Sequence, residues 1–81
     1  MADKVLRHLL LGFVRLHVLY HADKEDVCGV ELLEELRRHG YAIGPGTLYP
    51  LLHGLHADGL LAGTEAVVAG KRRLNFRATH A

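Results

Sequence analysis

The sequence predicts a mainly helical α+β fold in a single domain over residues 1–81, with three helices followed by a two-stranded β-hairpin. Two patterns lead to this prediction. Apolar residues recur at three- and four-residue steps through most of residues 4–56, as they do on the buried face of a helix. From Leu60 to Thr79, two extended stretches flank a tight turn that contains glycine, as in a hairpin. Three helices followed by a hairpin is the order of a winged helix-turn-helix, in which the hairpin is the wing.

The first helix is predicted from about Lys4 to His21. Its wide apolar face is expected to pack on the core through Val5, Leu6, Leu9, Leu10, Phe13, Leu16 and Tyr20. Leu11 and Val18 form a second, narrower stripe on the opposite side. Two interpretations of this stripe are open: isolated apolar residues on a surface, which are common, or a contact between the subunits of a dimer. A second subunit would add apolar burial that an 81-residue chain supplies with difficulty alone.

The second helix is predicted from about Val27 to His39, after a polar connection in which Asp23 or Asp26 can cap it. Acidic residues lie early in this segment and basic residues lie late, which suits the helix dipole. Gly40 is expected to end the helix in a left-handed conformation. The residues predicted to point inward are Leu32, Leu33 and Leu36.

The third helix is predicted to follow a turn at residues 44–46, with Thr47 as its N-cap and Pro50 in its first turn. Gly59 is expected to close the helix. The residues predicted to form its buried face are Leu48, Leu51, Leu52 and Leu55.

The hairpin is predicted as two strands, Leu60–Val68 and Lys71–Thr79, joined by a turn at Ala69 and Gly70. Apolar and polar residues alternate in the second strand, so one of its faces is expected to be buried. The net charge of the chain is only +1, but residues 41–81 hold four Lys/Arg against two Asp/Glu. Local concentration of positive charge matters more to a phosphate backbone than the total does. The consecutive cations of this region are Lys71, Arg72 and Arg73.

The composition excludes several classes of protein. The single cysteine, Cys28, rules out an intramolecular disulfide and a cysteine-rich zinc framework. No apolar stretch reaches the roughly 20 residues that cross a bilayer, and no signal peptide is visible, so a cytoplasmic protein without a membrane partner is expected. The chain has no serine, no glycine-rich phosphate loop after a strand and no carboxylate pair in a pocket-forming context. It is therefore not expected to be an enzyme.

The seven histidines raise the question of a metal site. His17 and His21 are four residues apart, and His53 and His56 are three apart, and both spacings place two imidazoles on one face of a helix. Neither pair has an adjacent carboxylate or cysteine at a recognised ligand spacing, although Cys28 could approach His21. Scattered surface histidines are the preferred interpretation, and no metal ion or other cofactor is expected.

The segment Gly46-Thr47-Leu48-Tyr49-Pro50-Leu51-Leu52 resembles the most characteristic motif of the PadR family of bacterial and archaeal transcriptional regulators. Residues 29–32 resemble the start of that family's second helix, and residues 70–79 resemble its wing. The resemblance therefore covers nearly the whole chain in the family's order. Family members usually carry cations in the third helix, and they usually continue into a C-terminal helical region that pairs the subunits, whereas this sequence stops at Ala81. The residues that replace the usual cations are His53, Gly54 and His56.

This resemblance implies binding to double-stranded DNA and regulation of transcription, as a repressor that acts as a homodimer on a near-palindromic operator. The third helix would enter the major groove, and the basic wing would lie on the backbone or in the minor groove. The implied DNA contacts are Thr47, Tyr49 and His53 from the helix and Lys71, Arg72 and Arg73 from the wing. The alternative is a winged-helix module that binds a protein partner, which the low net charge and the histidines of the third helix favour.

Overall fold

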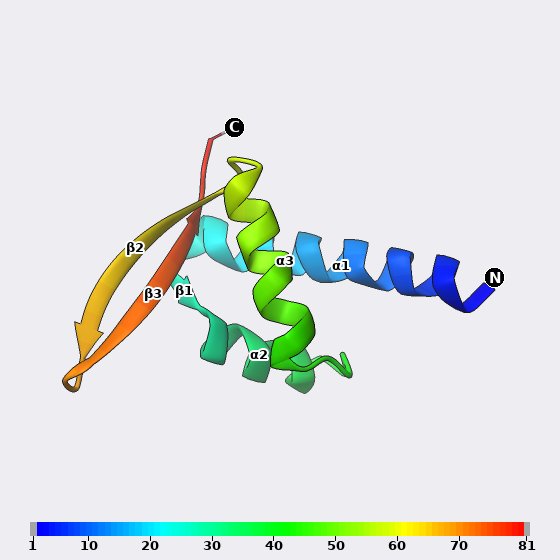
Figure 1. Cartoon of the computed structure of the whole chain (residues 1–81), viewed down its shortest axis with the longest axis horizontal. Coiled ribbons are helices and arrows are strands. Elements are labelled where there is room, and N and C mark those ends of the chain that lie inside the picture. The colour runs from blue at the N-terminus through cyan, green and yellow to red at the C-terminus, as the bar shows by residue number, and fades with distance from the viewer. Residues whose placement is uncertain (1, 81) are drawn as a thin grey trace.

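The computed structural model describes residues 2–80 and contains three helices and one antiparallel sheet (Figure 1). The elements in chain order are α1 (Ala2–Lys24), β1 (Val27–Cys28), α2 (Gly29–Arg38), α3 (Pro45–Ala57), β2 (Leu61–Val68) and β3 (Lys71–Ala78). The predicted winged helix-turn-helix is confirmed, with three helices before the hairpin. Within residues 2–80, no helix is both long enough and apolar enough to cross a membrane.

The orientation of α1 is opposite to the one predicted from the sequence. Val18 is completely buried, and Leu11 packs against the core, so neither residue points away from it. The prediction that Leu11 and Val18 form a contact between subunits is therefore wrong. The buried stripe runs at four-residue steps, with side chains small enough for α1 to lie close to its neighbours. Its fully buried members are Val14, Val18 and Ala22.

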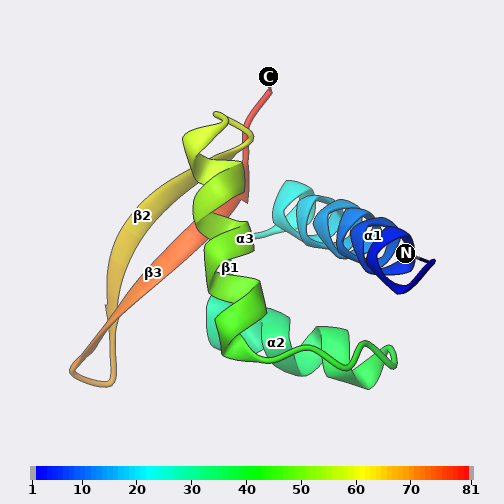
Figure 2. The same ribbon diagram turned by 45° about the vertical axis from the view of Figure 1, so that its right-hand side comes forward.

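The wide apolar face of α1 is exposed instead. A helix of 23 residues is about 34 Å long, and its N-terminal part extends past α3 in Figures 1 and 2. The narrow stripe packs against the core from Leu11 onward, and its residues are fully buried from Val14 onward. The exposed apolar residues of α1 are Val5, Leu6, Leu9, Phe13, Leu16 and Tyr20.

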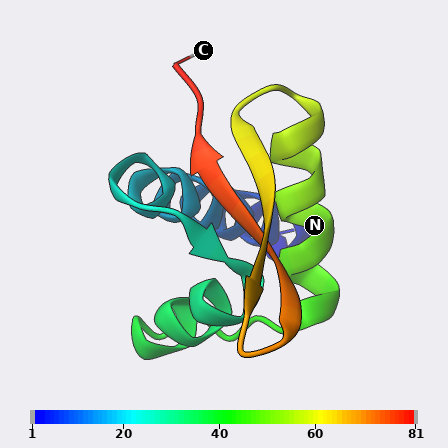
Figure 3. The same cartoon turned by 90° about the vertical axis from the view of Figure 1, so that its left-hand side faces the viewer.

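A short strand, β1, was not predicted. Val27 pairs with Phe76 and Cys28 pairs with Asn75, so β3 lies between β1 and β2 in a three-stranded sheet (Figure 3). Because Val27 and Cys28 are extended, α2 begins at Gly29 rather than at Val27. Cys28 is the N-cap residue and makes no capping hydrogen bond with its side chain, and the predicted cap by Asp23 or Asp26 is not formed.

The helix α3 begins three residues earlier than predicted. Gly44 is its N-cap residue, and the carbonyl of Gly44 accepts hydrogen bonds from the amides of Thr47 and Leu48. Thr47 therefore lies inside the first turn and is not the cap. Pro45 occupies the start of the helix, where a missing N–H breaks no helical bond. Pro50 falls in the second turn, where its missing N–H leaves one helical hydrogen bond unmade.

The predicted turns are confirmed at Gly40 and at the tip of the wing. Gly40 ends α2 with a φ of +89°. Val68 pairs with Lys71, which leaves a two-residue turn in which Ala69 and Gly70 have φ values of 52° and 76°. Two positive φ angles match the right-handed twist of the flanking strands.

The core lies where the three helices meet the base of the sheet. The four leucines predicted for the buried face of α3 are all buried, and α2 contributes the predicted Leu32 and Leu36. Phe76 of β3 is buried at the base of the wing, whereas Leu74, two residues nearer the tip, is exposed. The wing therefore projects from the core with only its base packed. The buried leucines of α3 are Leu48, Leu51, Leu52 and Leu55.

Candidate nucleic-acid interface

The buried leucines of α3 determine which of its residues face outward. Four leucines on one side of this 13-residue helix hold it against the core, and Tyr49 and His53, which lie four residues apart, share a flank beside that buried side. Both residues are exposed. The wing lies to the left of α3 in Figure 2.

A hollow of about 300 Å³ separates α3 from β3. Tyr49 and His53 line it from α3, and Arg72 and Arg73 line it from β3. The structure thus brings together four of the six residues predicted as DNA contacts. Lys71 lies next to them at the end of the hairpin and is exposed.

Tyr49 is held in place by Gly29, the first residue of α2. A Cβ atom at position 29 would overlap the ring of Tyr49, so only glycine permits this close approach. The ring of Tyr49 therefore lies across the start of α2 while the residue keeps 38% of its surface exposed. The role of Gly29 was missed in the sequence, where nothing indicates that position 29 lies beside position 49.

The three cations of the wing differ in their surroundings. The Nη1 atom of Arg73 lies 4.0 Å from Oε1 of Glu31 and donates a hydrogen bond to Sγ of Cys28 at 3.8 Å. The thiol of Cys28 donates to the same Glu31 oxygen at 2.9 Å. Part of the charge of Arg73 is therefore directed toward α2. Lys71 and Arg72 lie nearer the tip and are exposed.

Thr47 lies apart from this hollow. Its Oγ1 atom accepts a hydrogen bond of 3.5 Å from Nη2 of Arg7, on α1. Arg7 and Arg15, which are both exposed, line a second depression together with Thr47. Sequence reasoning missed these two cations. A signal was present, because Arg7, Leu11 and Arg15 recur at four-residue steps, and Leu11 packs against the core.

The sequence pattern of the transcriptional regulator PadR-like family matches residues 18–81 of this chain. Rv3488, a transcriptional regulator of Mycobacterium tuberculosis, is 51% identical to it over 76 residues. Those residues cover 94% of this chain and 71% of the length of Rv3488.

Solved structures of similar proteins have the same fold. A PadR-like transcription factor from Bacteroides fragilis superposes with a TM-score of 0.80 at 25% identity, over 96% of this chain and 77% of that one. A PadR family transcriptional regulator from Eggerthella lenta superposes with a TM-score of 0.74 at 32% identity, over 98% of this chain and 73% of that one.

Proposed function

The chain belongs to the PadR-like family of transcriptional regulators, which are not enzymes, and from this premise we propose that it binds double-stranded DNA as a homodimer. In this proposal α3 enters the major groove and the wing contacts the adjacent backbone or minor groove. The alternative, a module that binds another protein through the same surface, becomes one outcome of the test below.

The hollow between α3 and β3 carries this proposal. An aromatic ring, an imidazole and two guanidinium groups line it from two elements that lie side by side. A helix in the major groove offers its exposed side to base edges, and a ribbon beside it meets the flanking phosphates. Duplex DNA therefore fits both elements at once.

Positive charge flanks α3 on two sides. Lys71 and Arg72 are exposed near the end of the wing, and Arg7 and Arg15 are exposed beside the N-terminal end of α3. Cations on both sides of an inserted helix neutralise phosphates on the two strands that border the groove. We therefore add Arg7 and Arg15 to the proposed phosphate contacts.

The exposed apolar face of α1 supports the homodimer. Six large apolar residues between positions 5 and 20, all on α1, are more than half exposed. An apolar face of this extent is typical of a protein contact surface. A dimer would double the DNA contacts and would favour a near-palindromic site with half-sites one helical turn or more apart.

Repression is the simplest consequence of such binding, because a dimer bound across a promoter blocks access to it. A reporter gene under an operator selected from a random duplex library tests this sign of regulation. Falling expression with rising protein concentration is expected, and rising expression would make the protein an activator. The selected sites also test whether the operator is palindromic.

Salt dependence tests DNA binding itself. We expect binding to a selected duplex to weaken steeply as salt rises, because each neutralised phosphate releases counterions. The double variant Lys71→Ala/Arg72→Ala is expected to reduce the salt slope of the dimer by about 4, about one for each phosphate contact removed from its two subunits. Arg38→Ala is the matched control, because Arg38 lies on α2 and pairs with Glu35 at 3.1 Å. Its salt slope is expected to equal that of the unchanged protein.

Two outcomes would contradict the proposal. Absence of DNA binding at low salt would favour the protein-binding module. A loss of slope in the Arg38 variant that is half of the loss in the wing variant would mean that the charges act only through the net charge of the chain, because the wing variant removes two cations per chain and the Arg38 variant removes one.

A further inference from the structure

Three histidines and one glutamate converge between α1 and α2, on a side of the molecule that the proposed DNA contacts do not use. His17 and His21 lie one turn apart on α1, and Glu35 and His39 lie one turn apart at the end of α2. The Nε2 atoms of His17 and His21 are 2.9 Å apart. Nε2 of His39 and Nε2 of His21 lie 2.9 Å and 3.7 Å from the same oxygen, Oε1 of Glu35.

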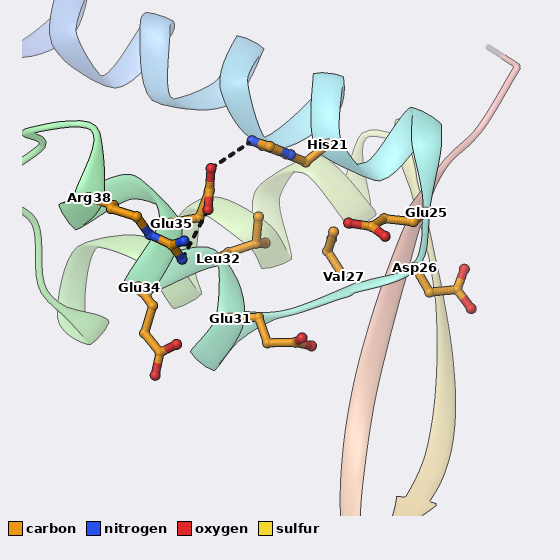
Figure 4. Close-up of a pocket in the computed structure, with 9 residues that line it drawn as sticks. All are labelled: His21, Glu25, Asp26, Val27, Glu31, Leu32, Glu34, Glu35 and Arg38. Carbon is orange, nitrogen blue, oxygen red and sulfur yellow. Dashed lines mark ion pairs between the residues drawn. The ribbon is translucent and has the colours of Figure 1, made fainter.

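The ligand atoms face a common point. One ring nitrogen of His17, one ring nitrogen of His39 and a carboxylate oxygen of Glu35 all lie within 4.8 Å of one another. Figure 4 shows His21 reaching from α1 toward Glu35 on α2, with the guanidinium of Arg38 on the other side of that carboxylate. Two helices that are distant in the sequence therefore each supply two donor groups.

The separations fit a tetrahedral metal site. At Zn–N and Zn–O bonds of about 2.0–2.1 Å, two ligand atoms of a tetrahedral ion lie about 3.3 Å apart. The observed contacts of 2.9, 2.9 and 3.7 Å lie on both sides of that value. These are three of the six separations among the four ligand atoms, and the ligand atoms of His17, Glu35 and His39 all lie within 4.8 Å of one another.

The contact between His17 and His21 indicates what an ion would replace. One of the two Nε2 atoms must carry the proton that the other accepts, so two potential ligand atoms share a single proton. When a metal ion binds, that proton moves to Nδ1 of the same ring by exchange with solvent, so the ring stays neutral and both Nε2 atoms donate their lone pairs to the ion. No covalent or redox step is involved.

The electrostatic surroundings leave these groups in the forms that bind metal. Partial burial, followed by the nearby His21 and His39, lowers the pKa of His17, so its neutral form is favoured. The hydrogen bond from His39, followed by the charge of Arg38, lowers the pKa of Glu35, so its ionised form is favoured. Neutral imidazole and carboxylate are the ligand forms.

We propose that His17, His21, Glu35 and His39 form a binding site for one divalent transition-metal ion of the zinc class, which joins α1 to α2. Three imidazoles with one carboxylate suit Zn²⁺ and its neighbours, whereas Mg²⁺ and Ca²⁺ require oxygen ligands. In the single chain, a depression lined by Phe13, Leu16, Tyr20 and three of the histidines gives an ion a path from the surface.

The site would link metal binding to the relative positions of α1 and α2. The helix α2 begins at Gly29, on which the ring of Tyr49 lies, and α1 carries the exposed apolar face proposed as the subunit contact. An ion held between the two helices therefore stabilises the arrangement from which both proposed surfaces are built.

Calorimetric titration of the metal-free protein with ZnCl₂ tests the site. We expect one Zn²⁺ per chain, and a tetrahedral absorption spectrum when Co²⁺ is the probe. His39→Gln and Glu35→Gln are each expected to weaken Zn²⁺ binding more than about 10-fold, since even the outer partners of metal ligands contribute that much. His8→Ala is the control, because His8 is an exposed histidine of α1, the helix of His17 and His21, and lies outside the cluster.

Thermal denaturation distinguishes a variant that has lost a metal-binding side chain from one that has lost its fold. His39 is half exposed, so its variant is expected to melt at the temperature of the metal-free parent. Zn²⁺ should raise the melting temperature of the parent and of the His8 variant, but not that of the His39 variant. Absence of Zn²⁺ binding to the parent, or an equal weakening by His8→Ala and His39→Gln, would overturn the proposal. Neither result depends on whether the protein binds DNA.

Discussion

Gly29 and Tyr49 form a pair in which a residue without a side chain positions an aromatic ring. We expect Gly29→Ala to push the ring of Tyr49 out of the hollow between α3 and β3, because the new Cβ atom would overlap it. The ring is at the free end of its side chain, so the cost in folding free energy should stay at or below about 1–3 kcal/mol. DNA affinity should fall about as far as in Tyr49→Ala. Gly12→Ala is the control, because a Cβ atom at position 12 meets nothing within 4 Å. An unchanged affinity for the Gly29 variant would remove Tyr49 from the interface.

Val18 and Leu16 test the two faces of α1. Val18 is 0% exposed and Leu16 is 65% exposed, although only one residue lies between them. Val18→Asp would place an unpaired charge in the core and is expected to cost about 3–5 kcal/mol, which should unfold much of the protein. Leu16→Asp should retain the folded far-UV circular dichroism spectrum. Equal urea midpoints for the two variants would contradict the orientation of α1.

At the scale of elements, the turn of the wing holds one residue, Ala69, in an unfavourable backbone conformation that a substitution can relieve. Ala69 has a φ of 52°, a conformation that costs an L-residue with a Cβ atom about 1–2 kcal/mol. Asparagine tolerates this conformation, and Asn-Gly is the preferred pair for such a turn. Ala69→Asn is therefore expected to stabilise the fold by up to about 1 kcal/mol in thermal denaturation, and Gly70→Ala is expected to destabilise it. A lower melting temperature for the Asn variant would contradict this account.

The elements with local signals could be predicted from the sequence. The leucines of α3, the glycine that ends α2 and the two-residue turn of the wing all act through neighbouring residues, and all lie where they were expected. The orientation of α1 could not be predicted in this way, because α1 has two apolar stripes and the periodicity does not indicate which one packs. The narrow stripe is buried because Val14, Val18 and Ala22 permit a close approach, whereas the wide stripe carries larger side chains.

Features that depend on residues distant in the sequence could not be predicted from the sequence pattern either. The strand β1 has two residues, too few for an alternation, and it exists because Phe76 and Asn75 lie beside it. The cluster of histidines and Glu35 was missed for the same reason. The pair His17 and His21 was visible, but its carboxylate partner lies on another helix, fourteen positions beyond His21 in the chain.

At the scale of the whole molecule, the exposed face of α1 determines the expected state of association. The double variant Leu9→Glu/Leu16→Glu is expected to convert a dimer into a folded monomer, because it places charges on the apolar surface that we propose a second copy covers. Light scattering coupled to size exclusion measures the mass. Val67→Glu is the control, since Val67 is an exposed apolar residue on the wing, and its mass should remain that of the dimer. A dimer that survives the double variant would place the contact elsewhere.

The pairing of β1 with β3 connects the base of the wing directly to the segment between α1 and α2. The segment that joins α1 to α2 is itself a strand of the sheet, so a rotation of these helices turns the hairpin at Phe76. Lys71 lies five residues farther along, about 17 Å at the rise of an extended strand. A rotation of about 10° at the base would then displace the tip by about 3 Å, comparable to the length of a hydrogen bond. Small adjustments between two helices would thus be enough to engage or release a phosphate at the far end of the ribbon.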